Sequence, residues 1–208
     1  MVKSVLVESS KAATAEFLDQ VGSRVGYPCV VKPNKGTSSA GQSSSSLTWL
    51  TGSLISCLGV NKVHTRKEIK EAVDGAFKID SQVVIEPCVS DGVEVSCTVH
   101  DITGDELLEA FPVTEITPEG EVFYSSDYTS KTSITTPSKT LRGEVVLQVT
   151  KVAKVAYRAL NLCGLATFDM IVQDDLPVIL EVNAVPAIGP SSLVIRQVIS
   201  AFCLYYQL

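Results

Sequence analysis

Two apolar segments on either side of Asp174 and Asp175 constrain the fold more than any other feature of the chain. Residues 165–173 and 177–185 are each rich in β-branched and aromatic side chains and have the length of one strand. The two aspartates between them are typical turn residues. The pattern therefore predicts an antiparallel hairpin.

This hairpin carries two carboxylates. If its turn is centred on Asp175, Asp169 lies opposite Glu181, roughly 5 Å away on the same face, and Asn183 points the same way. Carboxylates this close raise each other's pKa unless a cation neutralises them, and oxygen ligands without His or Cys suit Mg²⁺. A register slip of one residue would instead leave Asp169 and Glu181 as solvated residues on an exposed sheet face. The spacing alone leaves both interpretations open.

Elsewhere the chain alternates strands and helices, which predicts an α+β organisation in two halves that divide near residue 90. Between 120 and 140 we expect a long polar loop, and Pro112 suggests an edge or bend. The expected strands are 2–7, 27–33, 82–89, 93–101 and 107–116, with a turn at 90–92 joining the third and fourth. The expected helices are one capped by Ser9 or Ser10 and ending near Arg24, 65–77 with a Thr65/Glu68 capping box, 140–162, and a closing helix capped by Ser191 or Ser192.

Composition excludes several classes of function. The 208 residues carry a formal net charge of −6 with no run of Lys or Arg longer than two, which argues against non-specific binding to nucleic acid or anionic membrane. No secretory signal is visible at the start, and the longest apolar stretch, 47–60, is too short to span a bilayer. Six cysteines without a CxxC pair predict a reducing compartment, with neither a disulfide framework nor a zinc site.

The stretch "GYPCVVKPNKGTSSAG", residues 26–41, predicts a strand followed by a phosphate-binding loop. Lys32 lies near the end of the strand, and the small residues after it allow backbone N–H groups to approach phosphate. The order of residues is not that of a Walker motif, and a plain Ser/Gly surface loop explains the same stretch.

The stretch "VVIEPCVSDGVEV" carries Glu86 and Glu94 around a short connection that could bind an adenine edge and ribose hydroxyls, although a simple hairpin explains it equally. Lys131 either closes over phosphate or is solvated. His64 and His100 have no visible partners and are taken as structural.

The order of these motifs resembles the ATP-grasp family and, within it, the D-alanine–D-alanine ligases. The resemblance rests on "GYPCVVKPNKGTSSAG", "VVIEPCVSDGVEVSCTV", "FPVTEITP", Lys131 before "ITTP", "FDM" and "LEVNAVP". It runs from about residue 1 to 208 apart from one insertion. It implies an α+β ATP-grasp fold, with a small subdomain at 1–90 and a larger metal-binding subdomain at 91–208. Their antiparallel sheets would grip ATP between them, and the family's N-terminal substrate domain is expected to be absent.

The resemblance also implies the role of each site residue and the reaction. ATP phosphorylates the carboxylate of one D-alanine, or a similar amino acid, and the amine of a second attacks the acyl phosphate, as in peptidoglycan biosynthesis. The implied ATP contacts are Lys32 on the α- and β-phosphates, Ser38 and Ser39 in the flexible loop, Glu86, Val89 and Glu94 at adenine and ribose, and Lys131 in the closing loop. The implied ligands of Mg²⁺, or of Mn²⁺, are Asp169, Glu181 and Asn183. Ser192 is implied to contact the substrate carboxylate, and Ser38, Lys131 and Ser192 form the catalytic set.

Several positions depart from the family pattern. Thr167 replaces an arginine and Ala187 a glycine, both of which support the oxyanion in the family, and Thr132 replaces a tyrosine of the closing loop. Losing one oxyanion donor typically costs about 10²–10³ in rate. Residues 42–59 form an eighteen-residue insertion in the phosphate loop. We interpret the insertion as a retained intron or gene-model error, with a genuine lid as the alternative.

Two functions follow from the sequence. The first is an ATP- and Mg²⁺-dependent carboxylate–amine ligase, seen here in truncated form. The second is a catalytically impaired ATP-binding module, or one part of a tandem ligase-like protein. The expected partners are small molecules, without nucleic acid or membrane, and either a second copy or an N-terminal domain supplied by the full-length protein. A bacterial cytoplasm or a plastid stroma would suit the product, and no residue distinguishes them.

Overall fold

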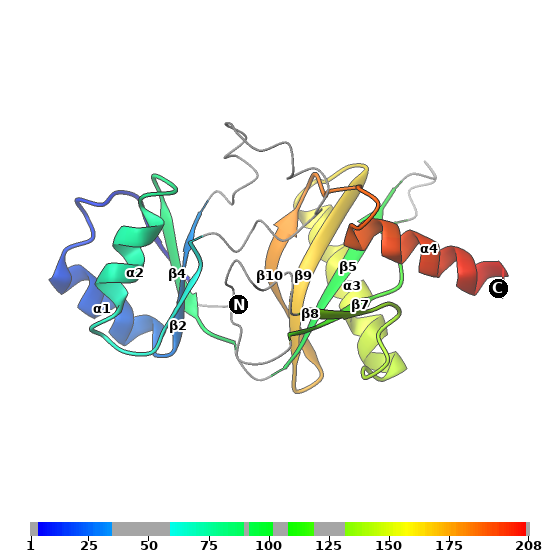
Figure 1. The fold of residues 1–208 in the computed structure, drawn as a ribbon, viewed down its shortest axis with the longest axis horizontal. Helices are drawn as coiled ribbons and strands as arrows, with labels where there is room; N and C mark the ends of the chain where they lie inside the picture. Colours follow the sequence, from blue (N-terminus) through cyan, green and yellow to red (C-terminus); the bar gives the residue numbers. More distant parts are fainter. Residues whose placement is uncertain (1–3, 35–58, 90–91, 102–107, 119–131, 207–208) are drawn as a thin grey trace. The chain divides into compact units, whose positions relative to one another are not determined.

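The computed structural model describes residues 4–34, 59–89, 92–101, 108–118 and 132–206. The chain divides into two compact units. In the described parts, the first unit comprises 4–34 and 59–89, and the second comprises the remaining ranges (Figure 1). The predicted boundary between residues 90 and 91 lies outside the described residues.

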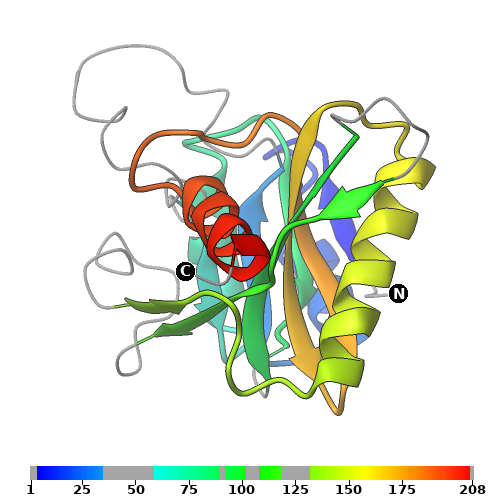
Figure 2. The ribbon, with the colours of Figure 1, turned by 90° about the vertical axis from the view of Figure 1, so that its right-hand side faces the viewer.

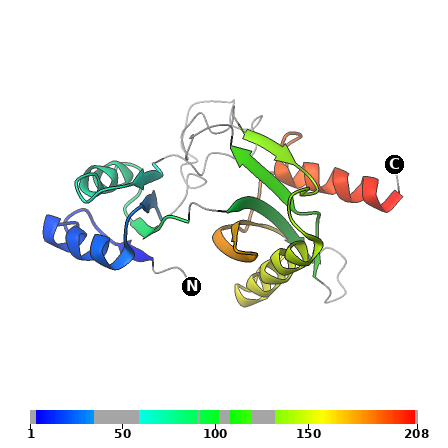
Figure 3. The same cartoon turned by 90° about the horizontal axis from the view of Figure 1, so that it is seen from below.

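The first unit is a four-stranded antiparallel sheet with two helices. Its strand order is β1-β4-β2-β3, and Figure 3 shows α1 and α2 side by side. In chain order its elements are β1 (Val5–Val7), α1 (Ala15–Val25), β2 (Cys29–Pro33), β3 (Asn61–Val63), α2 (Ile69–Ala76) and β4 (Val83–Pro87).

The two helices cover one face of this sheet. Leu18 of α1 and Val73 of α2 belong to one buried cluster with Val31 of β2 and Ile85 of β4. Because side chains alternate along a strand, Lys32 and Glu86 point to the opposite face. Both are half-buried.

The start of α1 differs from the prediction. Thr14, not Ser9 or Ser10, is the N-cap, and its side chain accepts a hydrogen bond from the Phe17 N–H at 3.2 Å. Ser9 instead closes a turn by accepting from the Ala12 N–H. Both predicted caps lie one turn early, because Ser and Thr favour turns and helix starts alike.

Before α2, Thr65 and Glu68 interact as expected, with a Thr65 Oγ1 to Glu68 Oε1 distance of 2.7 Å. The other Glu68 oxygen accepts from the His64 N–H. The helix itself begins only at Ile69.

The second unit is a six-stranded antiparallel sheet with two helices. The strand order is β10-β9-β5-β7-β8, and β6 also pairs with β5. In chain order its elements are β5 (Val93–His100), β6 (Glu109–Ala110), β7 (Thr114–Pro118), β8 (Thr132–Thr135), α3 (Gly143–Ala159), β9 (Leu165–Gln173), β10 (Leu176–Asn183) and α4 (Leu193–Tyr206).

The long helix α3 packs on one face of this sheet, and Figure 2 shows it running alongside the strands. Val149, Ala153 and Tyr157 form a buried cluster with Cys97 of β5 and Phe168 of β9. The helical spacing of apolar residues predicted this face. No helix in the described part of the chain is long and apolar enough to cross a membrane.

Three strand predictions are corrected. The strands β4 and β5 do not form a hairpin, because β4 pairs with β1 and β2 whereas β5 pairs with β6, β7 and β9. The strand expected at 107–116 is two strands, interrupted around Pro112, which has no N–H to donate. The expected loop at 120–140 contains strand β8, and residues 119–131 lie outside the described residues. The α+β fold built from two antiparallel sheets is confirmed.

Candidate functional site

The hairpin of β9 and β10 places Asp169 opposite Glu181, as predicted, but its turn and register differ from the prediction. The turn is the two-residue pair Asp174 and Asp175, both with positive φ (50° and 63°), and it pairs Gln173 with Leu176. This is the geometry of a tight hairpin turn. Continued without interruption, that register would place residue 180 opposite Asp169.

A β-bulge restores the predicted pairing. The register shifts between Ile179 and Glu181, so that Met170 pairs with Ile179 and Asp169 pairs with Glu181. Ile179 and Val182 lie on either side of the bulge, and both pack against the buried cluster that α3 forms with β5 and β9. Glu181 therefore points to the other face together with Asp169, which is how bulges redirect side chains.

Asp169 lies in an environment that disfavours its charge. The pKa of Asp169 is raised to about 7, mainly by burial and also by the nearby carboxylates of Glu181 and Glu94, while the Ser96 hydroxyl opposes the shift. Asn183 Nδ2 lies 3.3 Å from Asp169 Oδ2 and donates to it. A cation at this position would reverse the repulsion between the carboxylates.

The donor set on this face suits a hard cation. Asp169 and Glu181 supply carboxylate oxygens, and Asn183 can turn its amide oxygen toward a metal because Asn offers both donor and acceptor atoms. Mg²⁺ is commonly held by one or two carboxylates and otherwise by water and substrate phosphates. Nowhere in the described ranges do three or more His, Cys, Asp or Glu gather as a complete metal cage. The residues present therefore fit Mg²⁺ bound together with a phosphate ligand.

In the first unit, Lys32 and Glu86 lie together on the sheet face that the helices leave uncovered. The Lys32 Nζ to Glu86 Oε1 distance is 2.6 Å, and their side chains are 22% and 17% exposed. Strands β2 and β4 bring them together, because Val30 pairs with Glu86 and Lys32 with Val84. Val89, half-buried, follows the end of β4.

The structure places the other predicted residues as follows. Glu94 lies on β5 in the second unit, near Asp169. Ser192 is fully buried, and its Oγ accepts from the Ile195 N–H, so it caps α4 as predicted. Ser38, Ser39 and Lys131 lie outside the described residues, as does the insertion apart from Gly59.

Of the family departures, Thr167 lies on β9, on the same face as Asp169. Thr167 is 6% exposed, two residues before Asp169, and pairs with Asn183 of β10 and Thr98 of β5. Ala187 is exposed in the connection between β10 and α4. Thr132 is the first residue of β8.

The sequence reasoning missed a buried polar row on β5 and α4. Ser96, Thr98 and Gln197 are each 0% exposed, and Gln197 Nε2 donates to the Ser96 carbonyl at 2.9 Å. Within the described ranges, Thr98 Oγ1 and Gln197 Oε1 have no hydrogen-bond partner. The available signal was a glutamine in the apolar run "LVIRQVIS".

Comparison with known proteins gives consistent results. A family model described as the C-terminus of D-ala D-ala ligase matches residues 51–208. The D-alanine–D-alanine ligase of Christiangramia forsetii is 34% identical over 196 residues, covering 90% of this chain and 53% of the relative. The ligase of Clostridium botulinum (strain Alaska E43 / Type E3) is 36% identical over 179 residues, covering 82% and 49%. The chain thus spans about half the length of the curated relatives it matches.

Solved structures agree with this. The D-alanine–D-alanine ligase of Bacillus anthracis superposes with a TM-score of 0.71 at 26% identity, covering 98% of this chain and 57% of that one. The same organism's ligase complexed with ATP gives 0.70 at 25% identity, covering 97% and 55%. The two antiparallel sheets match the ATP-grasp portion of these enzymes.

Proposed function

Because the chain belongs to the D-alanine–D-alanine ligase family through its C-terminal, ATP-grasp region, we propose that it is an ATP- and Mg²⁺-dependent carboxylate–amine ligase. Its substrates would be ATP and two molecules of D-alanine or a similar amino acid. The γ-phosphoryl group passes to the carboxylate of the first amino acid. The amine of the second attacks the acyl phosphate, phosphate leaves, and an amide bond forms.

Each described site residue has a proposed part in this reaction. Asp169, Glu181 and Asn183 would hold Mg²⁺, whose charge would offset that of the transferring phosphoryl group. Lys32 binds the α- and β-phosphates once its ion pair with Glu86 opens. Glu86, Val89 and Glu94 contact the nucleoside. Ser192 orients the amino-acid carboxylate once its hydroxyl, which is buried in this structure, becomes accessible.

Three residues with proposed roles lie outside the described part of the chain. Ser38 and Ser39 would lie over the phosphates, and Lys131 would close the site. Such closure excludes water, which would otherwise hydrolyse the acyl phosphate.

The observation that carries the proposal is the facing pair Asp169 and Glu181. Neither strand periodicity nor the core requires a carboxylate at these positions. The arrangement raises the pKa of Asp169 to about 7, mainly through burial. A stability cost of this kind is typical of functional sites, and a bound cation would relieve it.

The test is ADP release from ATP in the presence and absence of D-alanine, with Mg²⁺ present. A ligase releases ADP only when D-alanine is supplied and yields a D-alanyl-D-alanine product detectable by mass spectrometry. Asp169→Asn should abolish turnover. Asp174→Asn is the matched control, because it makes the same change on an exposed turn of the same hairpin and should leave turnover unaffected.

The second candidate is an ATP-binding module without ligase activity, and Thr167 favours it. This buried threonine cannot supply the cationic donor that stabilises an oxyanion. The module would bind ATP with Mg²⁺ and yet release no ADP on addition of D-alanine. Thr167→Arg should then produce ligase activity only if the missing donor is the sole defect.

A further inference from the structure

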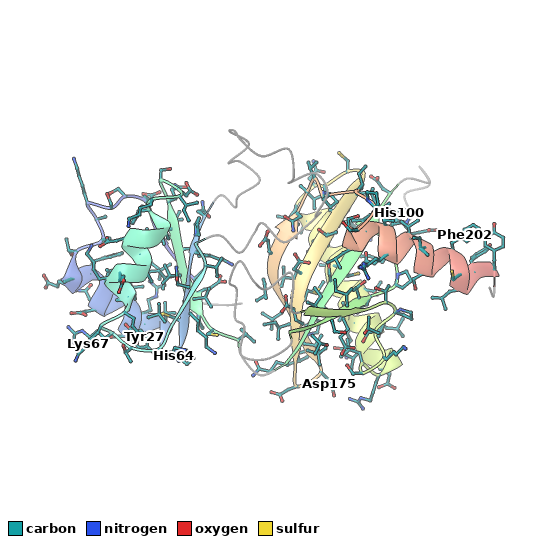
Figure 4. All side chains as sticks on the ribbon, in the orientation of Figure 1. Tyr27, His64, Lys67, His100, Asp175 and Phe202 are labelled. Carbon is teal, nitrogen blue, oxygen red and sulfur yellow. The ribbon has the colours of Figure 1, made fainter. Side chains whose placement is uncertain are left out.

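The buried side chains of helix α4 lie in its first two turns. Its buried residues are Leu193, Val194 and Gln197. Beyond Gln197 its side chains are half-buried or exposed, as with Phe202, which is 55% exposed (Figure 4). One of the three buried side chains of α4 is therefore polar.

That polar side chain makes a hydrogen bond to β5, the strand that pairs with β9 beside Asp169. Gln197 Nε2 donates to the Ser96 carbonyl at 2.9 Å, and Ser96 is the direct strand partner of Asp169. Among the described residues, Gln197 Oε1 has no hydrogen-bond partner. A leucine at position 197 would bury apolar surface and would leave no amide oxygen unpartnered. Burying an unsatisfied polar atom is unfavourable. Packing alone does not explain a glutamine here.

The connection between β10 and α4, residues 184–192, is bounded by one hydrogen bond to Asp169 and one to its strand partner Ser96. At its start, Asn183 Nδ2 donates to Asp169 Oδ2 at 3.3 Å. At its end, Ser192 caps α4, and Gln197 ties α4 to the strand residue opposite Asp169. Between these ends, Val185 and Ile188 are 93% and 65% exposed, so little packing fixes the segment itself.

We propose that Gln197 is a positioning residue that fixes Ser192 and the 184–192 segment relative to the Asp169–Glu181 pair. This inference rests on the proposed function, in which Ser192 orients the amino-acid substrate. Gln197 touches neither substrate nor metal. It acts by setting the distance between the amino-acid contact at the start of α4 and the phosphoryl-transfer site on β9 and β10.

The test compares Gln197→Met with Gln148→Met in the full chain. Methionine keeps the length and volume of glutamine and removes its amide, and Gln148 is an exposed glutamine on α3 of the same unit. Amide hydrogen exchange should accelerate about tenfold over residues 188–195 in Gln197→Met and stay unchanged in Gln148→Met, because one buried hydrogen bond is lost. Unchanged exchange in Gln197→Met would overturn the inference.

A kinetic readout separates positioning from general stabilisation. The KM for D-alanine should rise about tenfold in Gln197→Met, while the KM for ATP stays within about twofold, because only the segment bearing Ser192 is released. Equal increases in both values would indicate a merely structural role. If the unmutated chain releases no ADP with D-alanine, the proposed function fails, and hydrogen exchange still decides the role of Gln197.

If Gln197→Met does not fold, exchange in the unmutated chain decides instead. The N–H groups of Ser192 and Ile195 donate to Gly189 and Ser192 respectively. With Gln197 holding α4, both should be protected as strongly as amides in the core of α3. Exchange at the rate of an unstructured peptide would refute the positioning role.

Discussion

Replacing Asp169 with asparagine should stabilise the metal-free chain at neutral pH. In the folded chain the pKa of Asp169 is raised from 3.8 to about 7, mainly by burial and partly by Glu181 and Glu94. An unfolded aspartate titrates near its ordinary value. Between about pH 4 and pH 7 the folded state therefore binds more protons than the unfolded state, and the free energy of unfolding falls as the pH rises.

The size of this effect follows from the shift. At about 1.4 kcal/mol for each pH unit, three units would give an upper limit of about 4 kcal/mol. Part of the Asp169 surface is accessible, so water screens the charge and we expect about 2 kcal/mol above pH 7. Asparagine keeps the shape, and its side-chain oxygen can still accept from Asn183, so little else should change.

The assay is urea unfolding followed by far-ultraviolet circular dichroism from pH 4.5 to 8.5, with a chelator present. Asp169→Asn should match the unmutated chain at the acid end and exceed it increasingly toward pH 8. Asp174→Asn should follow the unmutated chain throughout. Parallel pH profiles for Asp169→Asn and the unmutated chain would refute the reasoning, as would a loss of stability on mutation at pH 8.

The remaining predictions concern other parts of the chain. Burial raises the pKa of Glu115, but hydrogen bonds from Thr140 and Ser138 outweigh it, and the pKa lies below its ordinary value. The carboxylate therefore stabilises the fold above its ordinary pKa, and this stabilisation is lost as the pH falls through the lowered pKa of the folded state. In urea unfolding, Glu115→Gln should lower the free energy of unfolding by about 1–3 kcal/mol at pH 7 and by less below pH 4. An equal loss at both pH values would contradict this prediction. Deleting residues 42–59 should leave the first unit folded, with its unfolding free energy changed by less than about 1 kcal/mol, because β2 and β3 are adjacent antiparallel strands whose ends stay joined by a shorter loop. Loss of cooperative thermal unfolding after this deletion would show that the segment is part of the fold.

Features set by local periodicity were predictable from the sequence. The apolar spacing along α3 predicted a helix and its buried side, since Val149 and Ala153 recur at helical intervals. The hairpin of β9 and β10 was predictable from two apolar runs around Asp174 and Asp175. Those signals depend only on neighbouring residues.

The bulge in β10 and the change of sheet between β4 and β5 were not predictable from the sequence. The facing of Asp169 and Glu181 was predicted from a turn centred on Asp175, whereas a two-residue turn and a bulge produce it together. No residue type marks the bulge, because Leu180 suits a regular strand equally. Likewise, β4 and β5 read as a hairpin, and only their pairing partners reveal that the chain changes sheet between them.

The role of Gln197 belongs to the same class. A glutamine in an apolar helix indicates an interaction, but its partner Ser96 lies 101 residues earlier in the chain. That Ser96 is the strand partner of Asp169 is known only from the register of β5 against β9.

Calorimetric titration of the purified chain with ATP, once with Mg²⁺ and once with a chelator, tests whether the chain binds ATP together with Mg²⁺. The account predicts binding that requires Mg²⁺ and that is lost in Asp169→Asn and weakened at least about tenfold in Lys32→Met, because each removes charge neutralisation from the phosphates. Asp174→Asn should bind as the unmutated chain does. Binding that is independent of Mg²⁺ and of Asp169, or no binding by the unmutated chain either as it stands or without residues 42–59, would contradict the account.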